Sequence, residues 1–228
     1  MDQENNKRLL DFISPFVTIH KRERIEEVLT QRTRHLTVVL EDIYQSQNAS
    51  AVIRSCECIG IQDVHVIEQK NFYKVNRDVL RGAGKWISLH RYKTAGSAQD
   101  CFSTLREMGY KIIGAAPETI YSTIQEIDIN HKLAIVFGTE LEGLSDYALK
   151  NVDGMVRIPM SGFTESFNLS VSAALVTFNL LTKVKTELQN WELTEREKLE
   201  LRLEWYKKSI KNAVKLETEF FRLYPGIS

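Results

Sequence analysis

Short apolar runs rich in β-branched residues alternate along this chain with segments of helical length, and this alternation constrains the fold more than any other feature. The runs lie at 36–40, 63–68, 110–115, 132–138 and 153–159. Strands separated by helix-length segments must be joined by crossover connections, which pair strands in parallel. The pattern therefore predicts an α/β fold, with a mostly parallel sheet flanked by helices. One core of this kind suits a chain of 228 residues.

The segments on either side of this alternation have a different character. Residues 7–35 form a pattern of one or two polar helices with a short apolar stripe, and residues 191–224 form that of one charged amphipathic helix. We predict three parts: a basic helical extension at 1–35, which looks like an appendage without a core, a main domain at 36–188, and a C-terminal helical extension at 189–228. Residues 169–183 are apolar on nearly every face, which predicts a helix at the domain centre or in a subunit interface.

Composition excludes several classes of protein. The chain carries 30 basic and 30 acidic residues, a polar N-terminus, and no run of about 18 uncharged apolar residues, so we expect neither secretion nor a membrane span. Three cysteines fit free thiols in a reducing cytoplasm better than a disulfide framework. Cys56 and Cys58 diverge on a predicted helix and the five histidines are scattered, so we expect no metal site. The usual hydrolase, dehydrogenase and P-loop motifs are missing from the sequence.

Positive charge is concentrated in residues 70–93, KNFYKVNRDVLRGAGKWISLHRYK. This segment contains seven basic residues and only one acidic residue, an aspartate, and aromatic residues are interleaved with the basic ones. Cations neutralise phosphates and aromatic rings stack on unpaired bases, so this mixture favours an RNA partner. A solvated loop with a few buried aromatic rings is the alternative interpretation.

Three further motifs carry polar residues at places where ligands bind. In QNASAVIRSCECIG, residues 47–60, Asn48 is expected to cap a helix, and Arg54 can grip a carboxylate or phosphate in two-pronged geometry. A structural ion pair would also explain Arg54. The motif VFGTELEGLSD, residues 136–146, follows a strand, and its acidic residues suit a ligand with positive charge, although it could be only a glycine-rich turn.

The last motif is IPMSGFTESFNLSVSAAL, residues 158–175. A strand ends at Pro159, and an irregular loop rich in hydroxyl groups leads to Asn168 or Ser170, one of which opens the apolar helix. Backbone and side-chain donors converge at such a helix N-terminus, which favours polar ligand groups. Taken alone, the motif could be a simple N-cap.

In order and spacing, the three motifs resemble those of the SpoU (TrmH) family of RNA methyltransferases in the SPOUT superfamily. The similarity covers residues 36–183. It implies a homodimer with a C-terminal trefoil knot, S-adenosylmethionine as cofactor, and methyl transfer to a ribose 2′-hydroxyl.

The resemblance also implies site residues. The catalytic set is Asn48, Arg54, Glu140, Ser166 and Asn168. The residues that contact the cofactor are Ala115, Gly138, Ile158, Met160 and Phe167. We predict RNA contacts from the basic residues Lys21, Arg24, Arg32, Lys74, Arg77, Arg81 and Lys85. A guanidinium stays protonated at neutral pH, so a phosphate-gripping role suits Arg54 better than that of a general base. Two departures from the family pattern are Phe167, where Leu is usual, and Ala49-Ser50, where many members have Gly.

The short helical ends resemble the tRNA branch of this family, which methylates guanosine 18 of the D-loop. We therefore expect a tRNA substrate and a cytoplasmic location. Methylation of large-subunit ribosomal RNA is the alternative, and a non-catalytic RNA-binding protein of the same fold is an alternative of another class.

Overall fold

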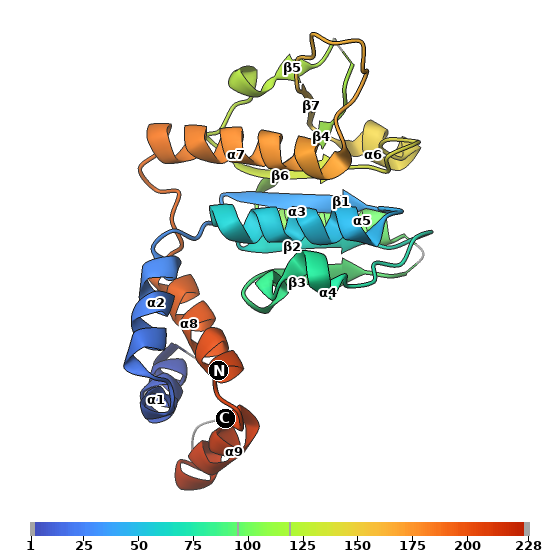
Figure 1. The fold of residues 1–228 in the computed structure, drawn as a ribbon. Coiled ribbons are helices and arrows are strands. Elements are labelled where there is room, and N and C mark those ends of the chain that lie inside the picture. The colour runs from blue at the N-terminus through green and yellow to red at the C-terminus, as the bar shows by residue number, and fades with distance from the viewer. Residues whose placement is uncertain (1–2, 95, 119, 226–228) are drawn as a thin grey trace. The chain divides into compact units, whose positions relative to one another are not determined.

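The computed structural model describes residues 3–94, 96–118 and 120–225 (Figure 1). Contacts between Cα atoms divide the chain into two compact units. One, here called the sheet unit, comprises residues 33–191. The other, here called the helical unit, comprises residues 3–32 and 192–225.

The sheet unit confirms the predicted α/β class. Its seven strands lie in the order β3-β2-β1-β6-β4-β7-β5, and every neighbouring pair is parallel. Their bounds are β1 (Leu36–Glu41), β2 (Asp63–Ile67), β3 (Ser88–Tyr92), β4 (Tyr110–Ala115), β5 (Ser122–Thr123), β6 (Lys132–Phe137) and β7 (Gly154–Arg157). All five predicted strands are present. The edge strands β3 and β5 were not predicted, because β3 is polar and β5 has only two residues.

Helices cover both faces of this sheet. They are α3 (Ser46–Ile59), α4 (Arg77–Leu80), α5 (Ser97–Glu107), α6 (Asp146–Asn151) and α7 (Leu169–Glu187), with short 3₁₀ turns η2 (Ala83–Lys85) and η3 (Ile124–Glu126). Along β1, Leu36, Val38 and Leu40 belong to the apolar cluster under α3 and α7, whereas Val39 belongs to the cluster under α5 and α6. Side chains alternate between the faces of a strand, so β1 contributes to both cores. In Figure 1, α3 and α7 lie side by side.

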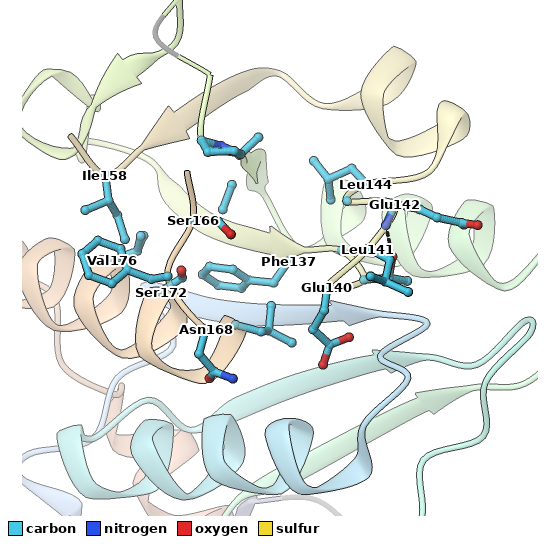
Figure 2. A pocket seen from close by; sticks show the side chains of 18 of the residues that line it. Phe137, Glu140, Leu141, Glu142, Leu144, Ile158, Ser166, Asn168, Ser172 and Val176 are labelled. Atoms are coloured by element: carbon cyan, nitrogen blue, oxygen red, sulfur yellow. Dashed lines mark hydrogen bonds between the residues drawn. The ribbon is translucent and has the colours of Figure 1, made fainter. Parts of the chain in front are cut away.

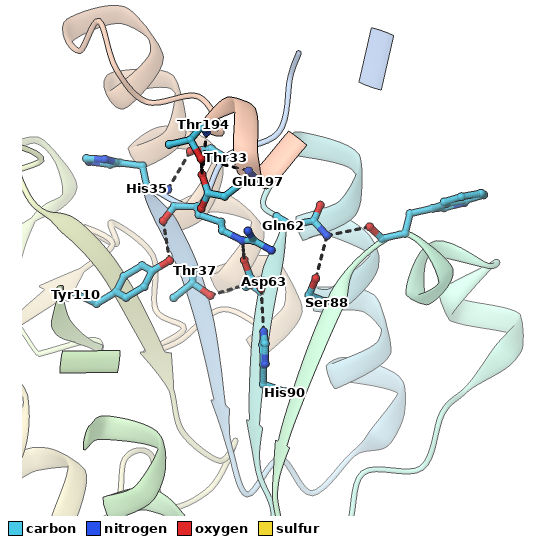
Figure 3. A network of polar contacts seen from close by, with 12 residues as sticks. Thr33, His35, Thr37, Gln62, Asp63, Ser88, His90, Tyr110, Thr194 and Glu197 are labelled. Atoms are coloured by element: carbon cyan, nitrogen blue, oxygen red, sulfur yellow. Dashed lines mark hydrogen bonds and ion pairs between the residues drawn. The ribbon is translucent and has the colours of Figure 1, made fainter. Parts of the chain in front are cut away.

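A polar network fixes the amino edge of the sheet (Figure 3). Asp63, which is buried, accepts a hydrogen bond from Arg34 Nε at 2.8 Å, and its other oxygen lies 2.8 Å from His90 Nε2. Thr37 Oγ1 donates to the Asp63 carbonyl at 2.6 Å. Burial opposes ionisation of the Asp63 carboxyl, but the hydrogen bonds and charges of His90 and Arg34 prevail and lower its pKa. The network therefore ties the start of β1 to β2 and β3 through one ionised carboxylate.

The helical unit consists of α1 (Gln3–Ile13), η1 (Ser14–Phe16), α2 (Ile19–Leu29), α8 (Glu195–Ser209) and α9 (Ala213–Leu223). The prediction of a single C-terminal helix was wrong. Thr194 and Glu197 form a capping box that starts α8, and Ile210 leaves the helical conformation, so the chain forms two helices.

The terminal segments also have a core, contrary to the prediction of an appendage. Leu9, Ile13, Leu29, Trp205 and Phe220 are almost completely buried. The N-terminal helices contact α8 and α9, which places both extensions in one unit where the sequence suggested two separate parts. Segments distant in sequence bury their apolar stripes against each other, and the pattern of one segment cannot show this.

In the part of the chain that the structure describes, no helix combines the length and apolar character needed to cross a membrane.

Candidate functional site

A cavity of about 660 Å³ opens at the carboxyl edge of the sheet, where ligands bind in open parallel sheets (Figure 2). Its walls are the loops that follow β4, β6 and β7, together with the first turn of α7. Phe137, Leu144, Val156, Ile158 and Val176 form its apolar part. The volume falls within the range of about 300–1,000 Å³ that is usual for small-molecule sites.

Three of the predicted catalytic residues meet at the mouth of this cavity. Asn48, which is buried, donates from Nδ2 to Glu140 Oε1 at 2.7 Å, and Asn168 Nδ2 lies 3.4 Å from Asn48 Oδ1. Figure 2 shows Asn168 and Glu140 pointing toward the same side of the cavity. The three side chains come from α3, the β6 loop and the start of α7, so the fold joins motifs that are about 90 and 120 residues apart in sequence.

Local structure explains how two of these side chains are held. Asn168 is the N-cap of α7, and its Oδ1 accepts hydrogen bonds from the Ser170 backbone at 2.9 Å and from Ser170 Oγ at 2.6 Å. The prediction that Asn168 or Ser170 opens this helix is confirmed for Asn168. The prediction that Asn48 caps α3 was wrong: the helix begins at Ser46, with Gln45 as N-cap, and Asn48 lies within the first turn. Its amide is therefore available for Glu140.

The β6 loop closes tightly on itself, and two glycines permit this. Thr139 and Gly143 exchange backbone hydrogen bonds of 2.8 and 3.1 Å. A Cβ atom on Gly138 would lie 2.0 Å from the Gly143 carbonyl oxygen, and Gly143 has a φ of +69°. The close approach leaves no room for a side chain at Gly138, and the left-handed conformation disfavours one at Gly143, so the loop that carries Glu140 is preorganised.

The lining of the cavity fits S-adenosylmethionine. The donor carries a positive sulfonium and an ammonium group beside an adenine ring. Glu118, Glu140 and Glu165 lie among the described lining residues, which include no Lys or Arg. Carboxylates stabilise the cationic groups, and the apolar part accommodates the ring, whereas a polyphosphate would be repelled.

All of the residues predicted to contact the cofactor line this one cavity: Ala115, Gly138, Ile158, Met160 and Phe167. The structure brings them together from three segments, at the ends of β4, β6 and β7, and their part in cofactor binding stays a prediction. The predicted catalytic residue Ser166 also lines it. Phe167 is 44% exposed, so its larger ring lies at the rim and leaves the apolar part open.

Arg54 lies elsewhere. It is exposed on α3, and its Nη1 donates a hydrogen bond to the Val79 carbonyl at 3.3 Å. It lines a different hollow of about 540 Å³ with Leu175 and Phe178 of α7. Within one chain, Arg54 therefore does not reach the cavity that holds the other predicted residues.

The basic residues predicted to bind RNA divide between the two units. Lys74, Arg77, Arg81 and Lys85 are exposed on the sheet unit. In the helical unit, Lys21 is half-buried and Arg24 is exposed beside Glu27, at 2.6 Å.

Two arginines of these basic segments have structural roles. Arg32 is 1% exposed and lies over the Trp205 ring at 5.4 Å, so the prediction that it contacts RNA is corrected: a side chain enclosed by its own unit cannot bind phosphate. Arg91 donates to buried Glu68 at 2.7 and 2.6 Å. Burial opposes ionisation of Glu68, but the hydrogen bonds of Arg91 and the Tyr73 backbone lower its pKa.

The structure adds lining residues that sequence reasoning missed. Gln45 follows β1 and accepts a hydrogen bond from Asn48 Nδ2 at 3.3 Å, and Glu118 follows β4. Their position just beyond the carboxyl ends of strands is the signal that could have identified them. Among the described residues, no group of three or more potential ligands is arranged to hold a metal ion.

This chain resembles known proteins over most of its length. The model of the SpoU rRNA Methylase family matches residues 35–178. A Borreliella burgdorferi protein named tRNA (guanosine(18)-2′-O)-methyltransferase is 46% identical over 212 residues, which cover 93% of this chain and 95% of that protein. The Thermus thermophilus protein of the same name is 33% identical, over 69% of this chain and 80% of that protein.

Solved structures show the same fold. The Aquifex aeolicus TrmH/SpoU tRNA modifying enzyme superposes with a TM-score of 0.74 at 22% identity, covering 84% of this chain and 97% of that chain. The SpoU methyltransferase AviRb from Streptomyces viridochromogenes, crystallised with AdoMet, gives 0.56 at 17% identity, over 72% and 62%. With a family model that matches most of the sheet unit and a relative of nearly equal length at 46% identity, this chain belongs to the SpoU methylase family.

Proposed function

We propose that this protein is a tRNA (guanosine(18)-2′-O)-methyltransferase that uses S-adenosylmethionine. The observation that carries the proposal is the meeting of Asn48, Glu140 and Asn168 at the mouth of an acidic and apolar cavity. The substrate follows from the name of the relative that matches 93% of the chain. The free thiols of the three described cysteines fit the proposed cytoplasmic location.

In this proposal, the bound cofactor supplies an electrophilic methyl group, and the chain provides binding and orientation. Asn48 and Asn168 hold the geometry of the mouth, where amide groups can hydrogen-bond a ribose. Glu140, held by its hydrogen bond from Asn48, would stabilise the cationic part of the cofactor. Holding both reactants in line removes much of the entropic barrier to methyl transfer.

We further propose that a second copy of the chain covers the outer face of α7. The helix was expected to be buried on all sides, yet Val171, Leu175 and Phe178 are 44, 38 and 59% exposed. Leu175 and Phe178 line the hollow that also contains Arg54. An apolar patch of this kind suits a two-fold interface, which would place Arg54 at the subunit boundary near the RNA. The trefoil knot implied by the family resemblance stays a prediction.

The function is tested by incubating the purified protein with labelled S-adenosylmethionine and total RNA, then mapping the methyl group. We expect label in the tRNA band, on the 2′-oxygen of guanosine 18. Label in the large ribosomal band would instead support the ribosomal substrate. If calorimetric titration showed no uptake of S-adenosylmethionine, the protein would be a non-catalytic RNA-binding member of the family.

A further inference from the structure

A second cavity, of about 750 Å³, lies beside the first at the carboxyl edge of the sheet. The two cavities share Gln45 and residues 139–144, so the β6 loop is the wall between them. The other walls of the second cavity include Glu41, the last residue of β1, Asp42 and Tyr44 just after it, and residues 69–71 after β2. Apart from Glu140, none of the residues predicted for catalysis or cofactor contact lines this second cavity.

The position of the second cavity relates it to the substrate. If the first cavity holds the methyl donor, the acceptor ribose lies at the mouth formed by Asn48 and Glu140. The base attached to that ribose must then occupy a space next to the mouth. Glu140 and Gln45 line both cavities, so the second cavity begins where the ribose ends.

The walls of the second cavity are preorganised. Asp42 has a φ of +51°, and its Oδ1 accepts hydrogen bonds from the backbone of Gln69, Lys70 and Asn71 at 2.7, 2.8 and 3.2 Å. Behind this turn, buried Glu68 is held by Arg91. On the opposite side, Glu41 accepts hydrogen bonds from the Ser145 backbone and hydroxyl at 3.0 and 2.6 Å. The carboxylates of Asp42 and Glu41 therefore hold the walls of the cavity in place.

Tyr44 extends from this rigid frame into solvent. Its side chain is 74% exposed while the turn two residues before it is pinned by Asp42, and its ring lines the cavity. An exposed aromatic ring on an ordered support can stack on a base with little loss of conformational entropy. RNA-binding proteins hold unpaired bases in this way.

Glu142 and Lys70 are charged side chains in the lining of the second cavity. Glu142 contacts Lys70 at 3.5 Å, and both side chains are about three-quarters exposed, so this pair is weak and can open. In Figure 2, Glu142 points away from Ser166 and Asn168, toward the other side of the loop. A carboxylate offers two acceptors, and guanine is the base whose Watson–Crick edge offers two adjacent donors, N1–H and the N2 amino group.

We propose that the second cavity receives the target guanine, with Tyr44 stacking on the base and Glu142 accepting hydrogen bonds from its N1–H and N2 amino group. Lys70, released from Glu142, is then free to neutralise a neighbouring phosphate. This inference rests on the proposed function, since it assigns the base that the methyltransferase would recognise. Enzymes that act on one nucleotide read an extruded base by stacking and by hydrogen bonds to this edge.

The test measures single-turnover methylation at saturating RNA, using tRNA that contains either guanosine or inosine at the target position. Inosine lacks the N2 amino group. For the unaltered protein we expect the rate with inosine to be about 10-fold lower. Glu142→Gln should lower the guanosine rate about 10-fold and should lose most of the discrimination between the two bases. Tyr44→Ala should lower the rate about 10-fold or more, and Tyr44→Phe should restore it.

The four combinations of protein and base form a double-mutant cycle, in which effects of inosine on RNA folding cancel. Glu107→Gln, an exposed carboxylate near the end of α5, is the matched control and should discriminate like the unaltered protein. The proposal is overturned if the Glu142→Gln protein loses the same factor on inosine as the unaltered protein, or if Tyr44→Ala is fully active. Failure of the proposed function is a separate result: no methylation of guanosine tRNA by the unaltered protein, although it binds RNA.

Discussion

At the residue scale, Arg54 is the one predicted catalytic residue that does not line the cofactor cavity of its own chain. Its side chain is exposed and lines a hollow that is separate from the cofactor cavity. A permanently charged, fork-shaped donor in this place suits the phosphate next to the target ribose.

We expect Arg54→Ala to lower the single-turnover methylation rate at saturating RNA about 100-fold, because the ribose hydroxyl would lose its alignment with the methyl group. Arg54→Lys should restore little of the rate, since a point charge cannot make two parallel hydrogen bonds to phosphate. Quench-flow measurement with labelled cofactor provides the rates. A variant with weaker RNA binding but an unchanged saturated rate would show that Arg54 only binds RNA.

His65 makes the stability of the sheet unit depend on pH. The ring is 1% exposed, lies 4.6 Å from the ring of His90, and its Nδ1 lies 3.1 Å from the Tyr92 hydroxyl. Burial and, secondarily, the charge of His90 lower the pKa of His65 to about 4, from an ordinary value of 6.5. The unfolded chain therefore binds more protons than the folded chain between pH 4 and 6.5, and stability rises with pH across this window.

This shift in the pKa of His65 corresponds to about 3 kcal/mol of stability. We predict that His65→Gln removes this part of the pH dependence, as measured by urea unfolding at several pH values between 4 and 7.5. The slope with pH is compared, so a general loss of stability in the variant does not affect the result. His131→Gln, at an exposed histidine, should retain the slope of the unaltered protein. An unchanged slope in His65→Gln would contradict the assignment.

At the scale of the element, the closed β6 loop joins the two cavities and carries Glu140. Its conformation depends on the contact between Gly138 and the Gly143 carbonyl, where a Cβ atom has no room. The backbone of this loop thus determines the shape of both cavities at once.

We predict that Gly138→Ala lowers the affinity for S-adenosylmethionine more than 10-fold, because the added Cβ would lie 2.0 Å from the Gly143 carbonyl oxygen and the loop must open by about 1 Å or more to accept it. Isothermal titration calorimetry measures the affinity. Gly109→Ala is the control: Gly109 has a φ of +82° with nothing within 4 Å of the added Cβ, so this change should cost about 1 kcal/mol of stability and leave cofactor affinity intact. Equal affinity in Gly138→Ala and the unaltered protein would contradict a rigid loop.

At the scale of the whole molecule, the outer face of α7 decides whether one chain is a complete enzyme. Its exposed apolar side chains adjoin the hollow that contains Arg54, apart from the cofactor cavity. A second copy of the chain is the occupant that would both cover this face and bring Arg54 to an interface.

We expect the unaltered protein to sediment as a dimer at micromolar concentration and Phe178→Glu to sediment as a monomer with little methylation activity, because a buried, unpaired carboxylate opposes association. Val214→Glu places the same charge on an apolar residue of the helical unit that is 77% exposed, and it should remain dimeric. A monomer for the unaltered protein at every concentration would refute the predicted homodimer.

Periodicity along the sequence determined the class of the fold and five of the seven strands, because apolar β-branched runs such as 132–137 can be buried only inside a covered sheet. The three motifs, by their resemblance to the SpoU family, also indicated Asn48, Glu140 and Asn168 as site residues. These inferences depend on local chemistry, which a linear sequence contains directly.

Only the tertiary structure decided which of these residues meet. It joined Asn48 to Glu140 and Asn168, left Arg54 on another face, and enclosed Arg32 against Trp205. It also united the two terminal segments in one core and formed the second cavity between the β1, β2 and β6 loops. Each of these outcomes depends on contacts between residues distant in sequence, which form only when burial of the apolar faces fixes the crossovers of the chain.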